Sequence, residues 1–499
     1  MANLKSLAKD TAIYGLSSIV ARFINYLLVP IQTRKFLATG GDYGIVTEVY
    51  AYVSLLIVLL TYGMETTFFR FMNKEGEHPQ RIYSTVLRMV GCTSALFMVL
   101  VVVFGKQISG WMGYADHPEY VMIMFITVAV DAFTAVLFAY LRYQHRPIKF
   151  ALLKIINILL NIALNLLYLF VLPAMKLNPW GIYDADFSPE VVWVFRINLM
   201  CTLLTLLMLW KELLGITFGF DKSACARMLA YTWPLLVMGL AGQLNQCASQ
   251  MLFPHFYSGT PEEARVQLGI YGACIKIAMI MVMITQAFRF AYEPFVFGKA
   301  KERDNRETYA QAMKFYLIFT LLAFLVVMGF LDVLKFIIDP SYWDGLRVVP
   351  IVMAAEIMFG VFFNLSFWYK LTDRTIWGAY FSGFGALVLI VLDIIFIPRM
   401  SYMACAWAGF VAYGVSMLIS YFVGQHYYPI RYPLRSMAAY VGIAVLFFVV
   451  MQWGRQALPS LLGLGLNCVL ILMFVGHIFY HDLPLKSLPV VGKYFGKVR

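Results

Sequence analysis

Charged residues are scarce in this sequence: only 13% of its 499 residues are Asp, Glu, Lys or Arg, whereas 61% are hydrophobic. The mean hydropathy is +0.75. This composition lies outside the range of water-soluble proteins, and no stretch is polar and long enough to form a separate soluble domain. We therefore expect the chain to be embedded in a membrane over nearly its whole length.

The sequence also lacks the patterns of several function classes. Its seven cysteines are scattered without disulfide or metal-ligand spacing, so we expect small buried residues and no metal site. There is no phosphate-binding glycine loop, nucleotide motif or catalytic constellation, which argues against an enzyme, an ATP-driven pump or a resident cofactor. Short loops carry most of the net charge of +12, so membrane topology explains it and nucleic acid is not an expected partner.

Long apolar segments fill most of the chain. About fourteen of them have the roughly 20 residues that a helix needs to cross about 30 Å of hydrocarbon. The predicted class is therefore an all-α membrane protein. The expected spans are residues 11–33, 44–64, 83–105, 118–141, 148–172, 190–214, 228–253, 266–290, 308–331, 346–370, 375–397, 402–424, 435–453 and 458–480.

The loops between these spans differ in positive charge. Of the 39 Lys and Arg residues, 25 fall on the side of the N-terminus, nine on the opposite side and five inside spans. The positive-inside rule therefore places both termini in the cytoplasm. The first segment contains Arg22 and Asn25 and has no small-residue cleavage site, so we expect it to be retained as a helix.

A glycine-containing segment after the sixth span divides the chain. We expect an N-terminal lobe over residues 1–214, a cytoplasmic linker over 215–227 and a second six-helix lobe over 228–424. Residues 425–499 would add two spans and a cytoplasmic tail. A shift of about 225 residues places spans seven and eight over spans one and two, and Gly44 on Gly269. Together with the equal lengths and the even span count of the lobes, this favours repeats that rock about a shared site.

The N-terminal region resembles a known family. The motifs that carry the resemblance are Tyr26-Leu27-Leu28-Val29-Pro30-Ile31-Gln32-Thr33-Arg34-Lys35-Phe36-Leu37, Asp42-Tyr43-Gly44, Tyr62-Gly63-Met64-Glu65 and Phe69-Arg70-Phe71. They resemble the opening of bacterial polysaccharide-transport proteins, the O-antigen-type flippases. These belong to a superfamily with the lipid II flippases and the multidrug and toxin extrusion transporters. The expected number of fourteen spans resembles that of the lipid-linked oligosaccharide branch. The Arg-Asp and Asp-Ala-Phe signatures of lipid II flippases are missing near the start of the sequence.

The resemblance implies a multi-pass protein of the bacterial inner membrane. It would move a polyprenyl-diphosphate-linked oligosaccharide to the outer leaflet by alternating access, for surface polysaccharide, lipopolysaccharide O-antigen or cell-wall assembly. Membrane lipids, and glycan polymerases or glycosyltransferases, would be its partners. The alternatives are a lipid II flippase, a cation-coupled multidrug exporter, and a membrane scaffold for glycan assembly enzymes.

Ionisable residues deep in the spans are candidates for function, because each costs about 2.5 to 3.5 kcal/mol near the bilayer centre. The family resemblance implies a cationic cavity lined partly by spans one, two, seven and eight. Arg22 and Lys276 are therefore our candidates for binding the diphosphate, with Arg289 at the end of its span as a third. Asp131 and Glu356 are candidates for coupling Na+ or H+, or for pairing with these cations.

Two groups of polar amides form a second set. Asn157, Asn161 and Asn165 share a helix face, where interhelical hydrogen bonds and sugar contacts are both plausible interpretations. In span seven we expect the cluster to face the sugar; it comprises Gln243, Asn245, Gln246 and Gln250. Four further charged residues lie near span ends, where snorkelling or loop capping is expected: Glu48, Lys154, Arg196 and Asp393.

Overall fold

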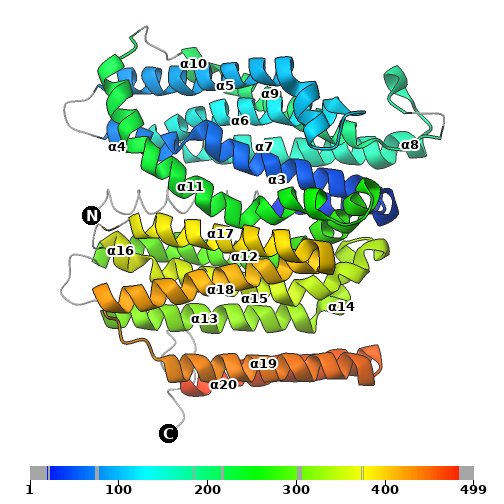
Figure 1. The fold of residues 1–499 in the computed structure, drawn as a ribbon, viewed down its shortest axis with the longest axis vertical. Helices are drawn as coiled ribbons and strands as arrows, with labels where there is room; N and C mark the ends of the chain where they lie inside the picture. Colours follow the sequence, from blue (N-terminus) through cyan, green and yellow to red (C-terminus); the bar gives the residue numbers. More distant parts are fainter. Residues whose placement is uncertain are drawn as a thin grey trace. The chain divides into compact units, whose positions relative to one another are not determined.

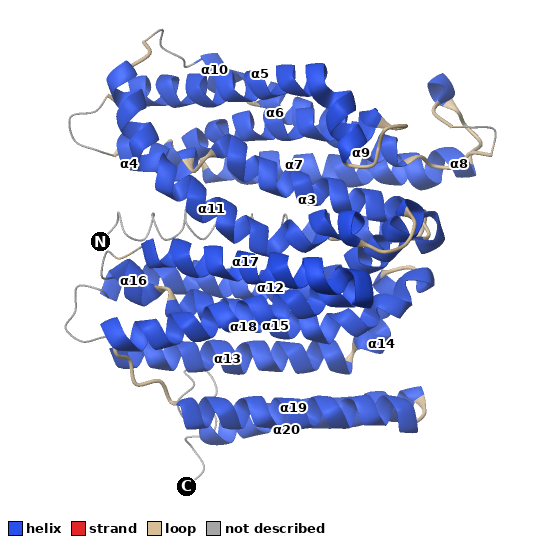
Figure 2. Ribbon diagram, in the orientation of Figure 1, coloured by secondary structure: helices blue, strands red, loops and turns tan. Residues whose placement is uncertain are grey.

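The computed structural model describes residues 20, 23–73, 78–183, 186–214, 219–299, 306–371, 374 and 376–482, without the side chains of Trp180, Leu214, 289–299 and Leu371. Within these ranges all regular structure is helical (Figure 2). In the described part of the chain, thirteen helical segments are long and apolar enough to cross a membrane. The predicted all-α membrane class is confirmed, and the first expected span lies mostly outside the described residues.

Helices suit these sequences because a helix satisfies its own backbone hydrogen bonds where water is absent. The first part of the chain forms α2 (Leu28–Thr33), η1 (Ala38–Gly40), α3 (Asp42–Thr61), α4 (Met64–Met72), α5 (Pro79–Trp111), α6 (Pro118–Tyr143), α7 (Pro147–Leu166), η2 (Leu167–Val171), α8 (Leu172–Ala174), η3 (Pro179–Gly181), α9 (Val191–Met208) and α10 (Trp210–Leu214). Proline stands in the first turn of α5, α6 and α7, where its missing N–H removes no helical bond.

The second part contains longer helices. It forms α11 (Lys222–Phe256), α12 (Pro261–Lys299), α13 (Arg306–Gly329), α14 (Leu331–Leu334), η4 (Lys335–Ile337), η5 (Pro340–Arg347), α15 (Val348–Leu365), α16 (Phe367–Leu371), α17 (Ile376–Met400), α18 (Tyr402–Tyr427), α19 (Leu434–Ala457) and α20 (Ser460–His481). Helix α11 begins inside the linker expected at 215–227. Asp221 caps it by accepting hydrogen bonds from the N–H groups of Ala224 and Ser223, which lower the pKa of its carboxyl.

The second span is broken rather than continuous. Helix α3 ends at Thr61, and Tyr62 and Gly63 both adopt positive φ angles, of 34° and 72°, before α4 begins. A β-carbon on Gly63 would lie 2.9 Å from the Leu235 Cβ atom of α11, so glycine fits both the backbone angle and the close approach. The buried hydroxyls of Thr67 and Thr232 join α4 to α11 at 2.8 Å.

Helix α10, just before the expected linker, is fixed to the preceding helices. The Glu212 side chain is almost completely buried, and its Oε1 atom lies 2.6 Å from the Lys149 Nζ atom of α7. The Tyr83 hydroxyl of α5 donates a hydrogen bond to the Glu212 carbonyl oxygen. Removing Glu212 would therefore leave Lys149 without its partner.

The chain divides into two compact units. The first comprises residues 1–276, 341–345 and 376–412, and the second comprises 277–340, 346–375 and 413–499. In the first unit α5, α6 and α7 run alongside one another (Figure 1), and α11 packs on α3 and α17. The six-helix lobes and their linker stay a prediction.

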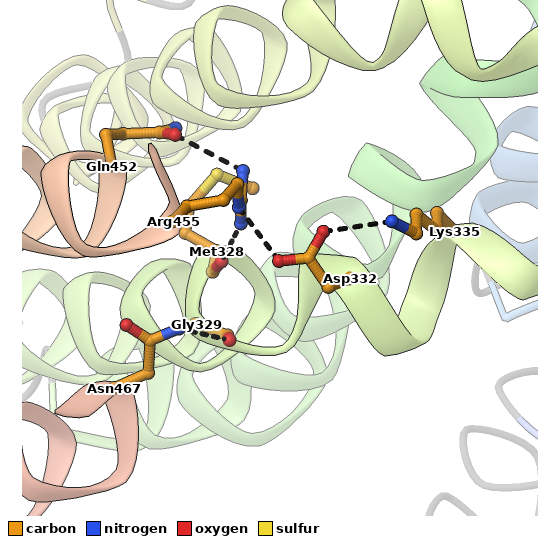
Figure 3. Close-up of polar contacts among 7 residues, drawn as sticks. All are labelled: Met328, Gly329, Asp332, Lys335, Gln452, Arg455 and Asn467. Carbon is orange, nitrogen blue, oxygen red and sulfur yellow. Dashed lines mark hydrogen bonds and ion pairs between the residues drawn. The ribbon is translucent and has the colours of Figure 1, made fainter. Parts of the chain in front are cut away.

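In the second unit α13 packs against α15 and against the pair α19–α20, whose two helices run side by side (Figure 1). Residues of this helix pair also donate hydrogen bonds to the C-terminal end of α13 (Figure 3). Arg455 donates hydrogen bonds to the Met328 carbonyl oxygen and the Asp332 carboxylate, and Asn467 donates one to the Gly329 carbonyl oxygen. The terminal carbonyls of α13, which have no partner in their own helix, are thereby satisfied.

Candidate functional site

Lys276 is a cation within a long apolar helix. It lies on α12, half-buried, next to the buried side chain of Ile277. Among the described residues no carboxylate or hydrogen-bond acceptor partners its Nζ atom. A structural cation within a span normally has such a partner. Lys276 therefore has the property expected of a residue that binds an anionic ligand.

Glu356 has the corresponding property in the second unit. It lies on α15, also half-buried, between the buried residues Ala355 and Ile357. Within the described part of that unit its carboxyl group has no hydrogen-bond or ion-pair partner. The carboxyl group is therefore free to take a cation or a proton, and its coupling role stays a prediction.

Asp131 instead belongs to a polar cluster in the first unit. The Thr202 hydroxyl of α9 donates a hydrogen bond to its Oδ1 atom at 3.1 Å, and Lys154 of α7 interacts with it electrostatically. The Lys154 Nζ atom also lies 4.3 Å from the centre of the Phe138 ring. Lys154 was expected to snorkel; its contacts lie within the bundle, where it contributes charge next to Asp131.

The asparagine stripe of α7 mainly makes protein contacts. Asn157 donates hydrogen bonds to the Cys201 carbonyl oxygen and the Thr205 hydroxyl of α9, at 3.1 and 2.7 Å. Asn165 is buried and donates to Asn161, one turn earlier in the same helix. These bonds explain how amides are accommodated in this span, and a sugar contact at Asn161, which is half-buried, stays a prediction.

The amides of α11 lie on two faces. Gln243, Gln246 and Gln250 share one face by their spacing, and in the structure they are half-buried, exposed and half-buried. Asn245 lies off this face, is buried, and donates hydrogen bonds to the carbonyl oxygens of Ala241 and of Ser382 on α17. The three glutamines therefore remain the sugar-facing candidates, whereas Asn245 holds two helices together.

Two carboxyl groups were placed wrongly by the sequence argument. Glu48 and Asp393 were expected to snorkel or cap loops, but their exposed fractions are 1% and 0%. Neighbouring helices and loops cover them although they lie near span ends. Asp393 accepts a hydrogen bond from the Ser249 hydroxyl at 2.7 Å, and Glu48 accepts one from the Tyr114 hydroxyl at 2.5 Å.

Two of the predicted anion-binding residues are not described. Arg22 and the Arg289 side chain lie outside the described residues. In the described part of the chain, no group of three His, Cys, Asp or Glu side chains could hold a metal ion. Among the described candidate residues, Lys276 and Glu356 thus have no partner, and Asp131 lies in a polar cluster.

Comparison with protein families decides the classification. A family model described as polysaccharide biosynthesis protein matches residues 7–291, more than half of the chain. The chain belongs to this family. The resemblance inferred from the N-terminal motifs is confirmed, and the chain is a multi-pass membrane protein. A search of curated protein sequences finds no match.

Several solved transporter structures share this fold. The lipid II flippase MurJ in an inward closed conformation has a TM-score of 0.71 at 15% identity, covering 94% of this chain and 99% of that one. An inward-facing multidrug resistance MATE transporter has a TM-score of 0.62 at 14% identity, covering 87% and 96%. The MATE multidrug transporter DinF-BH has a TM-score of 0.60 at 16% identity, covering 84% and 95%.

Proposed function

We propose that this protein is a flippase of the bacterial inner membrane that moves a polyprenyl-diphosphate-linked oligosaccharide from the cytoplasmic to the outer leaflet. The observation that carries the proposal is Lys276, a cation within a span and without a partner among the described residues. The family match to polysaccharide biosynthesis proteins supports the substrate class. The expected surface-glycan and O-antigen role, and the glycan enzymes as partners, belong to the same proposal.

In this mechanism Lys276 and Arg22 bind the diphosphate, and Arg289 assists at the end of the span. The ammonium group supplies a point charge, and guanidinium groups bind phosphate oxygens with paired hydrogen bonds. The three glutamines of α11 would contact the sugar, and the lipid tail would remain in the bilayer. A coupling ion, Na+ or H+, would act at Asp131 or Glu356.

A liposome assay tests this proposal. The purified full chain is reconstituted with an undecaprenyl-diphosphate-linked oligosaccharide whose sugar carries a fluorophore, and impermeant dithionite bleaches the outer leaflet. Wild-type protein should expose the inner pool to bleaching. Lys276→Gln should slow this by about tenfold or more, because a hydrogen bond to a charged group contributes about 1.5 to 3 kcal/mol.

Lys276→Arg and Lys106→Gln are the controls. Arginine keeps the charge and should retain much of the rate, and Lys106, exposed on α5, should be dispensable. Equal rates for Lys276→Gln and wild type would contradict the assigned role of Lys276. If liposomes with and without the protein bleach to the same extent, the proposed flippase function is wrong.

The MATE-like fold favours one second candidate, a cation-coupled exporter of amphiphilic drugs. In that case Asp131 and Glu356 form the main site. Neutral variants of these two carboxyl groups should then abolish export of a cationic dye, while Lys276→Gln has little effect. If the protein is a flippase, Lys276→Gln should impair glycan transport more than the neutral variants of Asp131 and Glu356 do.

A further inference from the structure

The first turn of α3 meets the second and third turns of α12 backbone to backbone. A β-carbon added to Gly44 would lie 1.9 Å from the Arg265 carbonyl oxygen, and one added to Gly269 would lie 3.0 Å from the Gly44 backbone nitrogen. These are the two glycines that the 225-residue shift superimposes. Both lie in the first compact unit, at the helix ends that the positive-inside rule places on the outer face. In this closed crossing the N-terminal ends of α3 and α12 are in direct backbone contact.

Glu48 lies one turn along α3 from Gly44, on the same helix face. Its side chain is buried, with 1% exposed. The Oε2 atom accepts a hydrogen bond from the Tyr114 hydroxyl, whereas the Oε1 atom has no partner among the described residues. One oxygen of a buried carboxyl group is therefore unsatisfied while the crossing is closed.

Three titratable or charged groups surround Glu48. Tyr114 comes from the connection between α5 and α6, Tyr52 from α3 itself and Arg265 from α12. Arg265 acts on Glu48 at longer range: it donates a hydrogen bond to the Gly113 carbonyl oxygen at 2.7 Å and lies 5.0 Å from the Tyr114 ring centre. No cation in the described chain forms an ion pair with Glu48. A buried carboxylate without such a pair costs much more free energy than a buried neutral carboxyl group, so burial at this place favours the protonated form.

We propose that Glu48 is a proton-binding site that couples protonation to closure of the α3–α12 crossing. The protonated carboxyl group is accommodated in the closed state. When α3 and α12 separate, water reaches Glu48 and takes the proton, and the resulting carboxylate opposes reclosure. This inference rests on the proposed function only in treating the crossing as the outer gate of a transporter.

Hydrogen–deuterium exchange of the full chain in lipid nanodiscs tests the site. Peptides covering 42–52 and 262–272 report opening, and a peptide from the interior of α6 corrects for the intrinsic pH dependence of exchange. One proton is linked to closure, so raising the pH should favour the open state. The corrected exchange rates of both wild-type peptides should therefore increase together, by up to about tenfold per pH unit across the titration of Glu48. In Glu48→Gln the crossing should stay closed, and the corrected exchange rates of both peptides should not change with pH.

Glu65→Gln is the matched control, since Glu65 is an exposed carboxylate of the same span, paired with Arg142. It should keep the wild-type slope. Tyr114→Phe keeps the carboxyl group and should keep the slope with a shifted midpoint, which leaves the test intact if Glu48→Gln does not fold. A flat wild-type profile, or an equal slope in Glu48→Gln, would overturn the proposal.

The two proposals fail separately. Protein-dependent flipping in liposomes together with a flat exchange profile refutes the proton site and leaves the flippase standing. An intact, Glu48-dependent slope without flipping of any lipid-linked glycan refutes the flippase and leaves the proton-linked gate standing.

Discussion

Asp393 shows how much a single hydrogen bond matters in this interior. Its carboxyl group is completely buried, and it accepts a hydrogen bond from the Ser249 hydroxyl of α11. Ser249→Ala removes that contact without adding volume. We expect a loss of stability of about 1 to 3 kcal/mol, the cost of leaving a buried polar group unsatisfied.

Thermal unfolding in detergent, followed by size-exclusion chromatography, checks this. Ser258→Ala is the control, because the Ser258 hydroxyl also bonds a residue of α17, the Pro398 carbonyl oxygen, but is exposed. Its unfolding temperature should be close to that of wild type. If both variants unfold alike, the Ser249 bond contributes no more than a surface bond.

Individual residues also show where sequence reasoning stops. Lys276, Asp131 and Glu356 could be found from the sequence, because a charge within an apolar run is visible without a structure. The Lys154 and Thr202 partners of Asp131 could not, since they depend on how α6, α7 and α9 face one another. Glu48 was misplaced because depth along a span says nothing about which helix covers the side chain.

At the scale of elements, the backbones of α3 and α12 lie close together where the two helices cross. Gly44→Ala would place a β-carbon 1.9 Å from the Arg265 carbonyl oxygen, and backbone cannot move aside as a side chain does. We expect the two helix ends to separate, so amide exchange in residues 42–52 should rise severalfold. Gly383→Ala on α17 is the control, because no atom lies within 4 Å of its new methyl group.

An ion pair also joins the α19–α20 pair to the N-terminal half of α13, away from the contacts of Arg455 and Asn467. Asp482, just after α20, pairs with Lys314 of α13 and accepts a hydrogen bond from the Tyr440 hydroxyl of α19. Burial tends to raise the pKa of Asp482, but these two partners outweigh it, and the pKa lies below its ordinary value of 3.8. The carboxylate therefore stabilises the fold above about pH 4, and this contribution is lost as the pH falls through the lowered folded-state pKa.

Exchange of peptides from 434–482 at pH 6 and pH 3 measures this effect. Wild-type protein should lose protection at pH 3, whereas Asp482→Asn should already show the lower protection at pH 6 and change little. If wild type and Asp482→Asn lose the same protection on acidification, another group causes the loss.

Elements were predictable where hydrophobicity decides them. From the second span onward, the expected spans correspond to helices from α3 to α20, because an apolar run in a bilayer has no other way to satisfy its backbone. The break at Tyr62 and Gly63 was not expected. A single glycine in an apolar run does not reveal a positive φ angle, which here follows from the close approach of α11.

At the scale of the whole molecule, the chain belongs to a polysaccharide biosynthesis family and has the helical fold of known membrane transporters. The fold is shared with MurJ and with MATE transporters, so architecture does not select the cargo. In the proposed mechanism, cargo choice depends on cavity shape and on a few charges such as Lys276, and the overall hydrophobic pattern does not reveal either.

The most direct measurement is mass spectrometry of membrane lipids after depletion of this protein in its own host. The flippase predicts that one polyprenyl-diphosphate-linked glycan accumulates, and that wild-type and Lys106→Gln proteins clear it while Lys276→Gln does not. Accumulation of lipid II alone would identify a lipid II flippase. No accumulation of any lipid-linked sugar, with retention of a cationic dye, would contradict the account and favour the exporter.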